Sequence, residues 1–119
     1  MQNLTNTVKE FNALIQEQKW AEALDKFYDE NLISIDNEGE PLKGLPSLKK
    51  GLESFVANTS DMKLVLKNVI VSDDISVTEW HYIFTHAQWG KFDQHQVSLQ
   101  RWKNGKIIHE RHHYKTDKF

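Results

Sequence analysis

The chain contains no cysteine, so disulfides, thiolate nucleophiles and cysteine-ligated metals are excluded. It also lacks any block of like charge, and its 15 basic and 17 acidic side chains build no phosphate-tracking surface. No apolar run approaches the roughly 18 residues that a membrane span requires. The first residues, MQNLTNTVKEF, have neither the basic nor the apolar segment of a secretory signal. We therefore expect a soluble, cytoplasmic protein that binds neither nucleic acid nor membrane.

The sequence has no repeats, low-complexity tracts or linkers, and its length fits one domain over residues 1–119. A domain of this size buries roughly two thirds of the surface that its unfolded chain exposes. In the first half, apolar residues recur at helical spacing. This pattern predicts helices near residues 8–15 and 20–27 and a third that begins around Pro46, with a brief strand at 32–36 before it.

In the second half, apolar and polar residues alternate, which predicts strands at 63–71, 75–89 and 92–102. Asn104-Gly105 then favours a type I′ turn, because both central residues of that turn need positive φ, and it predicts a long terminal hairpin. Helices that precede a mostly antiparallel sheet indicate an α+β fold. We expect a curved sheet wrapped around the helices, with a concave pocket between them.

The last predicted strand carries an unusual run of titratable side chains. Because alternate side chains of a strand face opposite sides, Ile108 shares one face with Glu110, His112 and Tyr114. The other face then carries His109, Arg111 and His113. The run does not converge on one metal ion, although His81 could meet His109 or His113 across the strands. We predict no metal site and expect the outer histidines to face a partner or solvent.

Two stretches together resemble a known family: KFYDENLISIDNEGEPLKGLPSLKKGL, and much later QRWKNGKIIHERHHY. They are similar to the nuclear transport factor two-like superfamily, and within it to SnoaL-like polyketide cyclases and ketosteroid isomerase-like proteins. The likeness covers nearly the whole chain. It implies a cone-shaped barrel in which a curved mixed, mostly antiparallel sheet wraps around three N-terminal helices. The family is often dimeric and keeps a pocket at the open end of the cone.

The resemblance places a general base at Asp36, where the first strand ends before a glycine-containing loop. In the isomerases this aspartate moves a proton alpha to a carbonyl. The isomerases also use a first-helix tyrosine and a protonated carboxylic acid on the sheet to hold the oxyanion. Those positions fall at Phe11 or Asn12 and near Ser98, which supply neither a phenol nor an acid. Steroid isomerisation by that mechanism is therefore not predicted.

The same resemblance and strand parity together assemble a candidate site. The candidate catalytic residues are Asp36, His86, His112 and Tyr114, acting as base, acid or oxyanion donors. The alternatives are a loop-start aspartate at Asp36 and, for the others, a polar network that fills a half-wet cavity. The candidate ligand-binding residues are Phe11, Trp20, Phe55, Trp80, Tyr82, Phe84, Ser98, Gln100, Trp102 and Glu110, whose aromatic members are equally typical of a core.

We expect a small-molecule pocket protein whose ligand is a small apolar compound. If it is catalytic, the reaction is proton transfer on an apolar carbonyl compound, as in an isomerase, cyclase or dehydratase. No motif requires a cofactor. The alternative is a non-catalytic ligand-binding or dimerisation module of the same fold. Val97 and Leu99 point outward by parity, which predicts a homodimer formed through the outer face of the sheet.

Overall fold

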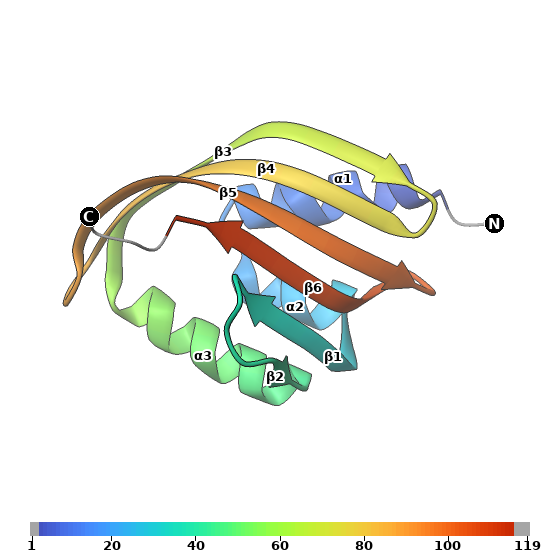
Figure 1. Ribbon diagram of the computed structural model, residues 1–119, viewed down its shortest axis with the longest axis horizontal. Coiled ribbons are helices and arrows are strands. Elements are labelled where there is room, and N and C mark those ends of the chain that lie inside the picture. Colours follow the sequence, from blue (N-terminus) through green and yellow to red (C-terminus); the bar gives the residue numbers. More distant parts are fainter. Residues whose placement is uncertain (1–2, 116–119) are drawn as a thin grey trace.

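The computed structural model describes residues 3–115, and within this range the chain forms three helices and six strands. No helix in the range is both long and apolar enough to cross a bilayer. Figure 1 shows the three helices on one side of a strongly curved sheet. In chain order the elements are α1 (Leu4–Gln16), α2 (Trp20–Phe27), β1 (Tyr28–Asp36), β2 (Leu42–Lys43), α3 (Leu45–Ala57), β3 (Thr59–Ser72), β4 (Ile75–His86), β5 (Gly90–Lys103) and β6 (Lys106–Tyr114).

Helices α2 and α3 begin close to where the sequence predicts them, and α1 begins at Leu4, four residues before the predicted position 8. The side chain of Asn3 caps α1 by accepting a 2.9 Å hydrogen bond from the Thr5 backbone N–H, which satisfies one of the free donors of the first turn. Gly44 precedes α3 with φ +92°, a conformation that favours glycine, and Pro46 occupies the first turn. Leu45 is the one buried residue of α3, and Leu48, Leu52 and Phe55 on the apolar side of this helix line a cavity.

The sheet has the strand order β2-β1-β6-β5-β4-β3. All its pairings are antiparallel except that of β1 with β6, which is parallel. Within the described residues the edge strands β2 and β3 do not pair with each other, so the cone stays open. This confirms the predicted α+β cone with a mixed, mostly antiparallel sheet. The strand β2 was not predicted, and β1 and β3 begin four residues earlier than the predicted positions 32 and 63.

A β-bulge corrects the predicted parity of the last strand. Arg101 pairs with His109, whereas the next residue, Trp102, pairs with Ile107, so Ile108 is the extra residue. Ile107 is fully buried and Ile108 only partly buried, which reverses the predicted inward position of Ile108. Beyond the bulge the predicted parity holds.

The core lies under the narrow part of the sheet and is rich in aromatic rings. The rings of Phe11 and Trp102 meet edge to face at 5.6 Å, and Phe27 packs against both. The indole N–H of Trp102 donates a 3.0 Å hydrogen bond to Ser76 Oγ. Such edge-to-face pairs add to the stabilisation that burial gives.

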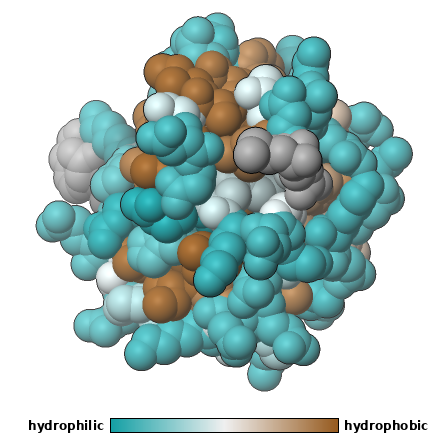
Figure 2. Space-filling model, turned by 90° about the vertical axis from the view of Figure 1, so that its right-hand side faces the viewer, coloured by the Kyte–Doolittle hydropathy of each residue, from teal (hydrophilic) through white to brown (hydrophobic). Residues whose placement is uncertain are grey.

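The outer face of the sheet is open. Val97 and Leu99 lie there with 38% and 36% exposure, as their parity predicts. Figure 2 looks at the end of the molecule where β3 turns into β4; hydrophilic side chains cover most of it, and hydrophobic ones gather in separate patches. The homodimer through the outer face stays a prediction.

Candidate functional site

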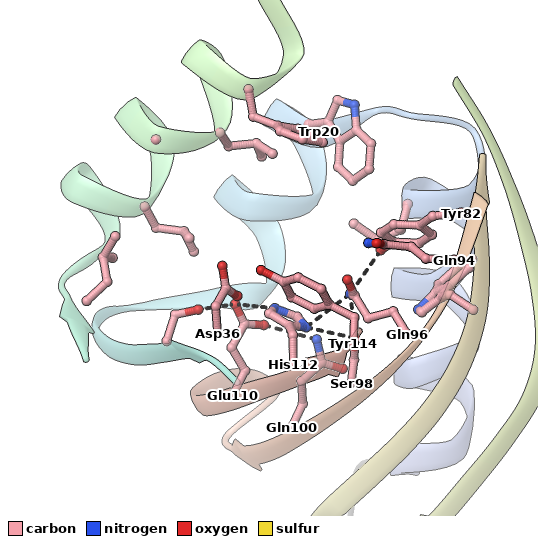
Figure 3. Close-up of a pocket in the computed structure, with 18 of the residues that line it drawn as sticks. Trp20, Asp36, Tyr82, Gln94, Gln96, Ser98, Gln100, Glu110, His112 and Tyr114 are labelled. Atoms are coloured by element: carbon pink, nitrogen blue, oxygen red, sulfur yellow. Dashed lines mark hydrogen bonds and ion pairs between the residues drawn. The ribbon is translucent and has the colours of Figure 1, made fainter. Parts of the chain in front are cut away.

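A cavity of about 670 Å³ lies between the concave side of the sheet and the helices. This volume is typical of sites for drug-sized molecules. One side, the helix wall, is apolar and consists of Phe11, Ile15, Trp20, Leu24, Leu48, Leu52 and Phe55. The opposite side, the polar wall, consists of Tyr28, Ser34, Asp36, Tyr82, Gln94, Gln96, Ser98, Gln100, Glu110, His112 and Tyr114. In Figure 3, Trp20 faces the polar residues across the cavity.

Glu110 is the centre of the polar wall and is 1% exposed. Its carboxylate accepts hydrogen bonds from Tyr28 Oη at 2.6 Å, Ser34 Oγ at 2.8 Å and Gln100 Nε2 at 3.1 Å. His112 Nε2 lies 3.2 Å from the second carboxylate oxygen. The donors come from β1, β5 and β6, so the pairing of these three strands is what builds the network. Both oxygens of the buried charge are satisfied.

The two charges of this pair fix each other's protonation. Burial alone would raise the pKa of Glu110, but the charge of His112 and the hydrogen bonds from His112, Tyr28 and Gln100 outweigh burial and lower that pKa to about 2. Burial would lower the pKa of His112, but the charge and hydrogen bond of Glu110, helped by Asp36, raise it above 6.5. Each group therefore favours the charged form of the other: Glu110 favours the imidazolium of His112, and His112 favours the carboxylate of Glu110.

The other ring nitrogen of His112 leads to a group of neutral polar side chains. His112 Nδ1 lies 2.8 Å from Ser98 Oγ. The amide nitrogen of Gln96 lies 3.2 Å from Ser98 Oγ and 3.3 Å from Tyr82 Oη, and Figure 3 shows these groups side by side on the polar wall. Burial, and next the charge of Glu110, raise the pKa of Tyr82, so its phenol stays protonated.

Asp36 and Tyr114 lie together at the mouth. Asp36 ends β1 beside His112 of β6. The following residue, Asn37 (φ +53°), donates its N–H to His112 O at 2.6 Å and accepts from the Tyr114 N–H through its side chain at 2.9 Å. Asp36 is exposed. Burial, and next the charge and side-chain hydrogen bond of Asp36, raise the pKa of Tyr114. The mouth thus carries a carboxylate beside a phenol.

The structure brings twelve of the fourteen candidate residues to the cavity and places two elsewhere. His86 is 5% exposed and stacks on Trp89, with ring centroids 3.7 Å apart. Its Nδ1 accepts hydrogen bonds from the backbone N–H groups of Gln88 and Trp89, so the ring closes the β4–β5 turn. Trp102 belongs to the core described above. Neither residue lines the cavity, which corrects their predicted positions.

Sequence reasoning missed Tyr28, Ser34 and Gln96. The alternation of side chains could have found two of them, because Ser34 precedes Asp36 by two residues and Gln96 precedes Ser98 by two. Tyr28 gave no such signal, since it lies between the predicted helix and the predicted strand and pairs irregularly with β6.

Residues 3–115 contain no cluster of three or more metal-ligating side chains with suitable geometry. On the outer face, His81 pairs with His95 in the β4–β5 register, and their rings stack at 4.6 Å. His81 Nε2 also lies 2.5 Å from Asp93 Oδ1. This corrects the predicted partners of His81, which were His109 and His113.

An open α+β cone with three helices and a pocket under the sheet is the fold of the nuclear transport factor two-like proteins. A family model described as the SnoaL-like domain matches residues 8–110. The chain therefore belongs to the SnoaL-like family. No curated protein matches it.

Several solved structures share the fold. A candidate SnoaL-like polyketide cyclase from Mesorhizobium loti is 21% identical over 93% of this chain and 98% of its own, with a TM-score of 0.82. A nuclear transport factor two-like protein of unknown function from Burkholderia pseudomallei is 16% identical over 97% and 92%, with a TM-score of 0.80. A protein of ketosteroid isomerase-like fold from Catenulispora acidiphila, in complex with trimethylamine, is 15% identical over 78% and 73%, with a TM-score of 0.68.

Proposed function

We propose that this protein binds a small apolar carbonyl compound in its cavity and transfers a proton on it without a cofactor. One observation carries the proposal: the exposed carboxylate of Asp36 and a buried set of hydrogen-bond donors line the same otherwise apolar cavity. A base and a group of hydrogen-bond donors that line one cavity are what enolisation needs.

The chemistry follows from the arrangement of the two walls. The helix wall holds the hydrocarbon part of the ligand by apolar contact, and the carbonyl oxygen turns to the polar wall. Asp36 removes a proton from the carbon next to the carbonyl. The electron pair of that C–H bond forms a C=C bond, and the π pair of the carbonyl moves to the oxygen, which gives an enolate. The protonated Asp36 then returns the proton to another carbon, which is an isomerisation. Loss of a leaving group or attack on a second carbonyl gives dehydration or cyclisation.

The donors differ from those of the ketosteroid isomerases. By the resemblance the first-helix position falls at Phe11 or Asn12. The Phe11 ring packs in the core against Trp102, and the Asn12 amide donates to Thr78 Oγ1 at 3.4 Å. Ser98 occupies the sheet position and is no acid. A carboxylic acid is present on the polar wall as Glu110, but its pKa near 2 keeps it ionised, so it cannot donate a proton to an oxyanion. The oxyanion must therefore be held by neutral groups or by the His112 imidazolium.

Exchange of α-protons tests the proposal. The probe is 2-tetralone, a bicyclic ketone with acidic protons next to its carbonyl, incubated with the protein in D₂O and followed by NMR. We expect exchange above the buffer rate and a fall of about 10²-fold in Asp36→Asn, which removes the base. Glu40→Gln is the matched control, because Glu40 is an exposed carboxylate that also lines the cavity.

Two outcomes contradict proton transfer by Asp36. Equal exchange in the wild type and in Asp36→Asn removes this residue as the base. Binding of the ketone with exchange at the buffer rate favours the alternative, a ligand-binding module without turnover. The Catenulispora acidiphila protein, which holds trimethylamine, supports such a role for this fold.

A further inference from the structure

We propose that the hydroxyl groups of Ser98 and Tyr82 are the oxyanion donors of the cavity, and that His112 and Gln96 turn both hydroxyl hydrogens toward the ligand. This inference rests on the proposed function and names the groups that receive the carbonyl. Some hydroxyls of the polar wall donate their hydrogen to another protein group, whereas others keep it available for a ligand.

The Ser98 hydroxyl has both of its lone pairs occupied. A hydroxyl offers one hydrogen and two acceptor positions. In this scheme His112, paired with Glu110, carries hydrogen on both ring nitrogens, so Nδ1–H donates to Ser98 Oγ at 2.8 Å and does not accept from Gln96 Nε2, which lies 3.3 Å away. The Gln96 amide donates to the same oxygen at 3.2 Å. Ser98 cannot return its hydrogen to either donor, and it lines the cavity. Its hydrogen is therefore directed to whatever occupies the cavity.

The Tyr82 hydroxyl is placed in the same way. Gln96 gives its second amide hydrogen to Tyr82 Oη at 3.3 Å. The two hydroxyls are thus neighbours, since both lie within hydrogen-bond distance of one nitrogen. The ring of Tyr82 is partly buried, and the residue lines the cavity. Two hydroxyl donors held by one amide form a pair that a single carbonyl oxygen can accept from.

The hydroxyls of Tyr28 and Ser34 give the contrast. Each donates its hydrogen to Glu110, at 2.6 and 2.8 Å, so neither is available to a ligand. By holding His112 as an imidazolium, Glu110 ensures that Nδ1 donates to Ser98 instead of accepting from it. Glu110, His112 and Gln96 are positioning residues in this scheme, and Ser98 and Tyr82 touch the substrate.

The series of contacts from Glu110 to His112 to Ser98 also resembles a nucleophilic triad. That role needs a neutral imidazole, which takes the serine proton as the serine attacks. In this scheme His112 carries both protons, because its Nε2 lies 3.2 Å from the buried Glu110 carboxylate, and Ser98 Oγ accepts from Nδ1–H. The geometry therefore makes Ser98 a hydrogen-bond donor to the ligand and leaves it inactive as a nucleophile.

The test compares 2-tetralone with tetralin, the hydrocarbon of the same ring skeleton. The readouts are the ratio of the two dissociation constants and the C=O stretching frequency of the bound ketone. We expect Ser98→Ala and Tyr82→Phe each to weaken ketone binding about 2- to 10-fold relative to tetralin, the size of one hydrogen bond. Each should also raise the C=O frequency toward its value in an apolar solvent.

The matched controls are Ser34→Ala and Tyr28→Phe. They remove the same atoms from the same cavity, but from hydroxyls whose hydrogens go to Glu110. We expect them to lower stability and to change the ratio and the C=O frequency much less than the Ser98 and Tyr82 variants do, because they act only through Glu110. Equal effects of the Ser34 and Ser98 variants, or no effect of the Ser98 and Tyr82 variants, overturn the assignment.

The two proposals fail separately. Asp36→Asn should keep the lowered C=O frequency while it slows exchange about 10²-fold. A lowered frequency without any exchange contradicts proton transfer and leaves the donor pair intact. Exchange that depends on Asp36 but not on Ser98 and Tyr82 contradicts the donor pair alone. A cavity that takes up neither ligand contradicts both.

Discussion

The two walls of the cavity differ in the kind of contact that they can make. The helix wall consists of aliphatic and aromatic side chains that gain from contact with any apolar surface, whatever its orientation. The polar wall consists of hydrogen-bonding groups, which are directional, so it gains only from a partner in the right place. The comparison teaches that retention of a ligand and its orientation are separate properties here, and that substitutions can remove one without the other.

The walls also differ in what they contribute to folding. The helix wall stabilises the fold whether or not the cavity is occupied, because several of its side chains are also part of the hydrophobic core. The buried charge on the polar wall is stable only while its partners are complete, since an unpaired buried carboxylate is strongly unfavourable. The polar wall therefore links the stability of the protein to the integrity of its site.

The largest expected effect comes from Glu110→Gln. It removes the charge that pairs with His112 while keeping the shape of the side chain, and we expect a loss of roughly 3 kcal/mol in the free energy of unfolding. Urea denaturation measures it. Glu53→Gln, on the exposed side of α3, is the control and should change stability by less than about 0.5 kcal/mol.

A double variant sharpens this result. Glu110→Met with His112→Leu replaces both charges by apolar groups, and it should be more stable than Glu110→Gln because no charge is left unpaired. A Glu110→Gln protein as stable as the wild type contradicts the view that the polar wall depends on this charge.

The next effect is on the pH dependence of stability. The pKa of Glu110 falls from 4.5 to about 2 on folding, so its contribution is present above pH 4.5 and is lost as the pH falls toward 2. The pKa of His112 rises above 6.5, so its contribution is complete below pH 6.5 and is lost as the pH rises through the raised value. The pair stabilises the fold most between pH 4.5 and 6.5.

We therefore expect the difference in unfolding free energy between the wild type and Glu110→Gln to be largest in that window. The difference should shrink by about 2 kcal/mol at pH 2.5. Denaturation curves at a series of pH values measure it, with His112→Gln as a second background. A difference that stays constant from pH 2.5 to 9 excludes the ion pair as its source.

The smallest effect concerns the helix wall. Phe55→Ala removes a ring that meets Phe84 edge to face at 5.3 Å beside the cavity. We expect 2-tetralone and tetralin to bind about fivefold more weakly, both to the same extent, because lost apolar contact does not distinguish them. Val56→Ala, at an exposed position one residue away, is the control. A selective loss of the ketone would mean that the helix wall orients the ligand too.

Much of the fold could be predicted because its signals are local. Helical spacing, Pro46 in the first turn of a helix and the Asn104-Gly105 turn each depend on neighbouring residues. The start of β1 at Tyr28 and the bulge at Ile108 could not be predicted in this way. Both depend on how distant strands align, which no local pattern records.

The residues of the candidate site could likewise be predicted only where the local strand pattern is regular. Alternation placed Ser98, His112 and Tyr114 on the cavity correctly, because they lie on the regular parts of β5 and β6. The prediction for His86 was wrong because this residue is the last of β4, where its ring bonds to the turn and stacks on Trp89. The assignment of hydrogens on the polar wall needed the complete network and was outside the reach of sequence.

The parallel pairing of β1 with β6 has a consequence for how the protein folds. It joins Asp36 to His112, which lie far apart in the chain, and loop closure over that distance is entropically unfavourable and slow. During synthesis the three helices and Asp36 leave the ribosome well before the strand that carries Glu110 and His112. The site is thus among the last parts to form, and a chain that is cut short before β6 presents its apolar wall to solvent.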